Sequence, residues 1–179
     1  MGETGYPVVL LVEQALSADD AARVRSLHEA IEEPVTYYVL LPVEDAAARI
    51  ESAMGSLSSN EFLGSPSLTM NEVDLDAVRR DARDRSQEDL AATLRALRDA
   101  GATAEGQLVD DAVRALQAKV AEVDGREAII LTRPHVIAEF FHVDWAAQAR
   151  RHLKVPVLHL LEHETFDEQA GEGEGITGM

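Results

Sequence analysis

The chain has 179 residues, of which 46% are hydrophobic and 27% charged, a balance typical of one globular domain with a sizeable core. Its formal net charge of −17 argues against binding to nucleic-acid backbones or anionic membranes, because both depend on clustered Lys and Arg. The absence of cysteine excludes disulfides, thiolate metal sites and a cysteine nucleophile. Neither a signal-peptide pattern nor an apolar run of about 18 residues occurs, so we expect a cytoplasmic protein.

Five segments along the chain have the composition of strands. Four are short, apolar and rich in β-branched residues, which is typical of parallel strands buried on both faces. The third segment is more polar and fits the edge of a sheet better than its centre. In chain order, the predicted strands are residues 6–12, 35–43, 102–109, 128–132 and 155–161.

Helical spacing of apolar residues occurs between these strands. The predicted helices are residues 17–31, 71–100 and 111–123, and a last one that leads into the final strand. Side-chain oxygens suit the amino end of a helix because they accept hydrogen bonds from its free N–H groups. Glycines suit the carboxyl end because they tolerate positive φ. The expected caps are Ser17, Asp110 or Asp111, and Asp144 at the amino ends, and Gly101 and Gly125 at the carboxyl ends.

The alternation of strands and helices predicts an α/β fold with right-handed crossovers. We expect a three-layer, open, parallel five-stranded sheet in the order 3-2-1-4-5, with the polar third strand at one edge. One domain should span residues 1–163. Within it, residues 44–71 are either an insertion over the carboxyl ends of the strands or a linker. Residues 164–179 are rich in Gly and Glu, which is typical of an acidic flexible tail.

Three short motifs on this pattern resemble the universal stress protein family. One precedes the third strand, one opens the fourth, and one joins a basic helix end to a Pro-Val-Leu strand. They are Leu97-Arg98-Asp99-Ala100-Gly101, Gly125-Arg126-Glu127-Ala128-Ile129-Ile130-Leu131, and Arg150-Arg151-His152-Leu153-Lys154-Val155-Pro156-Val157-Leu158. The likeness covers residues 6–162 and implies a fold that in some members binds ATP.

The ATP-binding members carry an Asp after the first strand, a Val after the second, and G-x2-G-x9-G-(S/T) after the fourth. Glu13 and Val43 match the first two positions, but the glycine motif is absent, with Ile130, Arg133, Val143 and Asp144 in its place. Glycines there allow close approach of backbone N–H groups to phosphate, whereas Pro134 has no N–H and a carboxylate at Asp144 repels phosphate. We therefore expect no ATP binding in the family's usual mode, and no bound cofactor.

The ends of the two central strands form the candidate ligand cleft, the place where open α/β sheets bind ligands. Its candidate residues are Glu13, Val43, Thr132, Arg133 and His135. Arg133 is expected either to hold an anionic ligand or to pair with Glu13 and close the cleft.

His135, Glu139 and His142 have the spacing of one helical face, and such a set could bind zinc. The apolar residues among them favour packing instead, so no metal site is expected. No nucleophile elbow or Ser-His-Asp order is present, and the acid pairs Asp19-Asp20 and Asp110-Asp111 are explained as helix starts.

The last strand is apolar on both faces although it should lie at an outer edge, and a long apolar edge invites pairing. The resembled family commonly dimerises there, so a homodimer through Val155, Val157, His159 and Leu161 is expected. The favoured hypothesis is a dimeric, non-enzymatic regulatory domain of universal stress protein type that acts through protein or ligand binding. A binder of another nucleotide or small anion is the alternative, and an enzyme is ranked last because no catalytic constellation is visible.

Overall fold

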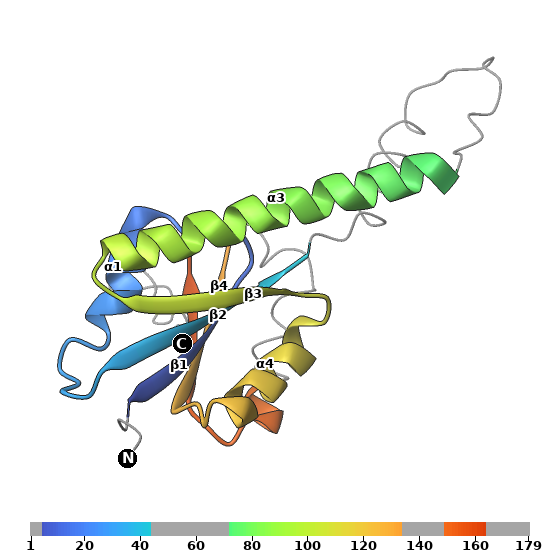
Figure 1. Ribbon diagram of the computed structural model, residues 1–179. Helices are drawn as coiled ribbons and strands as arrows, with labels where there is room; N and C mark the ends of the chain where they lie inside the picture. The colour runs from blue at the N-terminus through green and yellow to red at the C-terminus, as the bar shows by residue number, and fades with distance from the viewer. Residues whose placement is uncertain (1–4, 44–71, 134–148, 164–179) are drawn as a thin grey trace, which may run out of the picture.

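The computed structural model describes residues 5–43, 72–133 and 149–163, which form a five-stranded parallel sheet with helices on both faces (Figure 1). The strand order is β3-β2-β1-β4-β5, which confirms the order predicted from the sequence. The strands are β1 (Tyr6–Val12), β2 (Val35–Pro42), β3 (Thr103–Val109), β4 (Glu127–Thr132) and β5 (Val157–Leu161).

The helices form two layers around the sheet. The helices α1 (Ala18–Ser26) and α3 (Glu72–Asp99) lie on one face, and α4 (Ala112–Glu122) lies on the other (Figure 1). Residues 149–152 are also helical, and Ala149 packs in the core on the α4 side. The amino-terminal part of α3 extends past the edge of the sheet (Figure 1).

Two hydrophobic cores, one on each face, account for the continuous apolar strands. Along β1, Val8 and Leu10 pack under α1 and α3, whereas Val9 and Leu11 pack over α4. These four side chains are 0% exposed. Since successive residues of a strand point to opposite faces, a strand covered on both sides must be apolar at every position.

The predicted caps Ser17, Asp111 and Gly101 are present, whereas Gly125 is not the residue that takes positive φ after α4. Asp124 does so, with a φ of 52°, and Gly125 follows it and donates its N–H to the Val120 carbonyl at 2.8 Å. The Ser17 hydroxyl accepts a hydrogen bond from the Asp20 N–H at 3.1 Å, and the Asp111 carboxylate accepts one from the Arg114 N–H at 3.0 Å. Gly101 follows α3 with a φ of 83°, a conformation that costs glycine no side-chain clash.

Some element ends differ from those predicted. The first helix ends at Ser26 rather than near Ile31, because the chain after it makes hydrogen bonds to the third residue back in successive tight turns. The last strand begins at Val157, because Pro156 lacks the N–H that a sheet ladder needs, although its carbonyl still accepts from the Ala128 N–H at 2.9 Å. Val155 therefore precedes the strand in which it was predicted.

A polar cluster that the sequence did not reveal lies near the amino ends of the strands. His28 is 3% exposed, and its Nδ1 lies 2.7 Å from the Tyr37 hydroxyl. Its Nε2 lies 2.5 Å from the Glu127 carboxylate, which also accepts a hydrogen bond from the Tyr6 hydroxyl at 3.3 Å. Arg126 lies over the Tyr6 ring at 5.6 Å. The cluster thus ties the turn after α1 to the first residues of β1, β2 and β4.

Some predictions lie outside the described residues and stay predictions. Among them are the roles of residues 44–71 and 164–179, and Asp144 as the cap of the last helix.

Candidate functional site

The carboxyl ends of β1 and β4 bring Glu13 and Arg133 together. Val12 is the partner of Leu131 in the parallel register, which places Glu13 opposite Thr132, one residue before Arg133. The Glu13 carboxylate accepts three hydrogen bonds from Arg133: from the backbone N–H at 3.1 Å, from Nε at 3.3 Å and from Nη2 at 3.1 Å. Of the two sequence-based possibilities for Arg133, the structure shows the ion pair with Glu13.

This ion pair changes what the end of β4 can bind. The first backbone N–H beyond β4 is a group that could hold an anion, and here it already donates to a carboxylate of the same chain. The Glu13 side chain is 9% exposed, whereas that of Arg133 is 47% exposed. The acid is therefore enclosed and the guanidinium stays partly open to solvent.

Thr132 lies beside this pair and points to the neighbouring edge strand. It is 2% exposed, and its hydroxyl lies 2.9 Å from Nε2 of His159 in β5. Burial, together with the charge of Arg150, lowers the pKa of His159, so its ring is neutral near pH 7. Thr132 and His159 therefore join β4 to β5 rather than offering a free nucleophile and base.

Glu162, directly after β5, is a buried acid that the sequence analysis missed. It is 1% exposed, and one carboxylate oxygen accepts a hydrogen bond from Gln14 Nε2 at 2.5 Å. Its other oxygen, Oε1, is buried and has no hydrogen-bond partner among the described residues. Burial raises the pKa of Glu162, and the nearby carboxylates of Asp20 and Glu13 raise it further against the lowering effect of Gln14.

Asp20 lies in the first turn of α1, as predicted, and it also holds the chain just beyond β5. It is 2% exposed and forms an ion pair with Arg23 at 3.1 Å. It also accepts a hydrogen bond from the backbone N–H of His163 at 3.1 Å. Asp19 is exposed and suits its interpretation as a helix-start residue.

Val43, another predicted site residue, is not brought into this group. Val43 is half-buried after β2, and its N–H donates to the Val109 carbonyl at 2.8 Å, so it extends the pairing of β2 with β3. His135, Glu139 and His142 lie outside the described residues. Among the residues that are described, no group of three His, Asp or Glu side chains could hold a metal ion.

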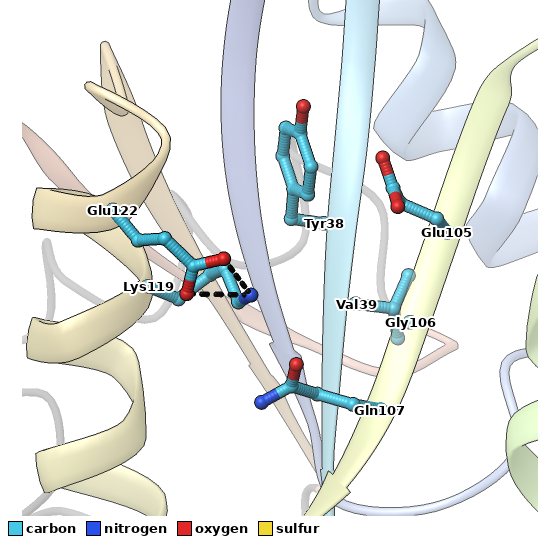
Figure 2. Close-up of a pocket in the computed structure, with 7 residues that line it drawn as sticks. All are labelled: Tyr38, Val39, Glu105, Gly106, Gln107, Lys119 and Glu122. Carbon is cyan, nitrogen blue, oxygen red and sulfur yellow. Dashed lines mark hydrogen bonds and ion pairs between the residues drawn. The ribbon is translucent and has the colours of Figure 1, made fainter.

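A small hollow lies on the α4 side of β2 and β3 (Figure 2). It encloses about 90 Å³, and Lys119 and Glu122 of α4 form an ion pair at 2.9 Å inside it. The sheet contributes Tyr38, Glu105 and Gln107. Since the volume is small, the hollow does not have the size of a cofactor site.

These features together define a class of protein: an open α/β domain with strand order 3-2-1-4-5 and an ion pair across the ends of its two central strands. No helix in the described part of the chain is long and apolar enough to cross a membrane.

Comparison with solved structures assigns this architecture to the universal stress protein fold. A universal stress protein from Archaeoglobus fulgidus matches with a TM-score of 0.50 and 19% sequence identity, covering 86% of this chain and 92% of that one. The hypothetical protein MJ0577 matches with a TM-score of 0.50 and 10% identity, covering 89% and 97%. No protein-family model and no curated protein matches the sequence. The likeness at these identities concerns the fold alone.

Proposed function

We propose that this chain is a cytoplasmic regulatory domain of universal stress protein type, without enzymatic activity, which acts as a homodimer by binding a protein or ligand. The observation that carries the proposal is the Glu13–Arg133 pair at the carboxyl ends of β1 and β4, where the strand order changes direction. Open α/β sheets bind ligands at this edge, and here the carboxylate of one strand takes the N–H and guanidinium of the other.

ATP binding in the usual mode of the resembled family is excluded from the proposal on chemical grounds. A triphosphate at the end of β4 would have to displace Glu13 from Arg133, or lie beside its negative charge. Glu162 and Asp20 contribute further acidic groups at the same edge. The local charge therefore opposes a polyanion, and the long side chain at Arg133 replaces the close backbone approach that glycine would allow.

We expect no nucleotide to remain bound after mild purification, and no ATP binding tighter than about 1 mM. Native mass spectrometry of the full chain tests the first expectation, and calorimetric titration with ATP and Mg²⁺ tests the second. Retention of ATP that is weakened by Glu13→Ala or by Val43→Glu would contradict the proposal. Turnover of a nucleotide panel, abolished by a cleft substitution, would contradict the non-enzymatic assignment.

A second candidate function rests on the exposure of Arg133. Because 47% of its side chain is exposed, the guanidinium could turn from Glu13 to a smaller anion, such as a monophosphate. In this alternative, Glu13→Gln should strengthen phosphate binding several-fold by freeing Arg133. The double variant Glu13→Gln/Arg133→Gln is the matched control, and equal affinity in both variants would remove the alternative.

The homodimer is proposed at β5, the strand that closes one edge of the sheet. Leu158 of β5 is 37% exposed, and it is an exposed large hydrophobic residue that the predicted contact set had omitted. Apolar edge strands pair readily across a two-fold axis, since each contact then occurs twice.

We expect Leu158→Glu to weaken the dimer at least about tenfold without unfolding the protomer, since a charge would then enter the interface twice. Sedimentation equilibrium gives the dimer dissociation constant, and circular dichroism monitors the fold. Thr103→Glu is the matched control, because it adds the same charge to an exposed position of the opposite edge strand, β3. A wild-type chain that stays monomeric, or a dimer sensitive only to Thr103→Glu, would be the contrary result.

A further inference from the structure

We propose that the acidic C-terminal segment of one protomer, residues 164–179, docks on the basic segment 150–154 of its partner. The inference rests on the homodimer through β5 proposed above, and it identifies the polar contacts that flank that interface.

The basic segment is unusual in this chain. In a protein with a net charge of −17, residues 150–154 include no acid. Their polar side chains are all exposed: Arg150, Arg151, His152 and Lys154. Buried or half-buried apolar neighbours, Ala149 and Leu153, fix the backbone to the core on the α4 side. The segment is thus a firmly held positive patch on an otherwise acidic molecule.

The patch lies beside the proposed interface. Only four residues separate its helical part from the first residue of β5, and the charge of Arg150 acts on His159 within that strand. A group that docks on the patch would therefore lie at the amino end of β5, along the edge where the partner is proposed to pair.

The acidic segment begins at the other end of the same strand. The described chain runs through β5 and a turn to His163, whose backbone N–H is held by Asp20. The 16 residues that follow contain no Lys or Arg and carry the carboxylates of Glu164, Asp167, Glu168, Glu172 and Glu174. Fully extended, they could reach roughly 50 Å.

Two-fold symmetry brings these opposite charges together. When identical edge strands pair across a two-fold axis, they run antiparallel, so the carboxyl end of one β5 lies next to the amino end of the other. Paired strands are only about 4.8 Å apart, whereas within one protomer the five residues of β5 separate the two segments by about 17 Å. In such a dimer, the start of the acidic segment is therefore nearer to the partner's patch than to the protomer's own.

This contact would make the dimer electrostatically selective. Two acidic proteins repel each other, but here each copy offers one basic patch to the acidic segment of the other. Both of these contacts form only in the symmetric dimer. Salt should weaken the dimer, because exposed ion pairs at an interface rim are screened.

The first test reverses the patch. Arg150→Glu/Arg151→Glu/Lys154→Glu in the full chain should weaken the dimer roughly tenfold at low salt, with little difference from wild type at about 1 M salt. Arg79→Glu/Arg80→Glu/Arg83→Glu is the matched control, since it makes the same charge change at exposed positions of α3. Adding Glu164→Lys/Asp167→Lys/Glu168→Lys to the patch variant should restore dimerisation. Equal weakening by both triple variants, or no rescue, would overturn the proposal.

The second test locates the contact, and it benefits from a chain without cysteine. Chains carrying only His152→Cys are mixed with chains carrying only Thr165→Cys, exchanged and lightly oxidised. A disulfide between the two different chains is the expected result. If a chain with both substitutions cross-links only within itself, or if no cross-link forms in a dimer that Leu158→Glu still disrupts, the docking is wrong and the β5 dimer stands. A monomeric wild type would overturn both.

Discussion

Replacing His28 by Ala is expected to lower the free energy of unfolding by about 3 kcal/mol. The imidazole is 3% exposed, and both of its nitrogens are hydrogen bonded, one to Tyr37 and one to Glu127. Truncation would leave a cavity, and the buried Tyr37 hydroxyl and the half-buried Glu127 carboxylate would have fewer partners. Tyr37 is itself 0% exposed, and burial raises the pKa of its hydroxyl to about 12. The hydroxyl therefore stays protonated, because the interior disfavours the charged phenolate.

Urea unfolding monitored by circular dichroism measures this change. The control is Tyr6→Phe, which removes only the longer hydrogen bond, of 3.3 Å, at the half-buried side of the same cluster. It should lower the stability by about 1 kcal/mol or less. Equal effects of the two substitutions would mean that His28 is not the centre of the cluster.

The His28 cluster also shows why part of the fold could not be read from the sequence. The strands and their order follow from apolar runs and from one polar strand, which are local patterns. His28 and Glu127 are 99 residues apart, and the motif that contains Glu127 gives no sign of a histidine partner, so only the assembled sheet brings them together. The same contact explains why the first helix stops early: His28 lies in the turn, where its ring reaches β2 and β4, rather than continuing the helical face toward Ile31.

The candidate site was partly predictable for a related reason. Glu13 and Arg133 each follow a predicted central strand, and adjacent parallel strands bring their ends to one edge, so topology alone placed them together. Glu162 also follows a strand, but its burial depends on Gln14 and on the position of α1. A carboxylate after an apolar run usually lies in solvent, and the sequence offered no signal that this one is covered.

The buried acid at Glu162 leads to the second large effect: Glu162→Gln should stabilise the protein at pH 8 by about 1–3 kcal/mol. One oxygen of the carboxylate has no hydrogen-bond partner in the described part of the chain, and the carboxylate lies near the charges of Asp20 and Glu13. A glutamine keeps an oxygen for the Gln14 hydrogen bond, removes the buried charge, and offers an NH₂ group near those two carboxylates.

The pH dependence of this gain follows from the raised pKa of Glu162 in the folded state. The unfolded chain releases the proton near the ordinary value of 4.5, whereas the folded chain releases it at higher pH, so the native charge becomes a penalty as pH rises between these two values. Below about pH 4 the acid is protonated in both states, and the advantage of glutamine should disappear. Thermal unfolding of wild type and variant from pH 4 to 8 should therefore give stabilities that diverge with rising pH.

Glu29→Gln is the control, because it removes the same charge from an exposed position and should leave the pH profile of stability nearly unchanged from that of the wild type. Parallel pH profiles for wild type and Glu162→Gln would show that water or a neighbouring group forms hydrogen bonds to this carboxylate. The ionised Glu162 would then not lower the free energy of unfolding.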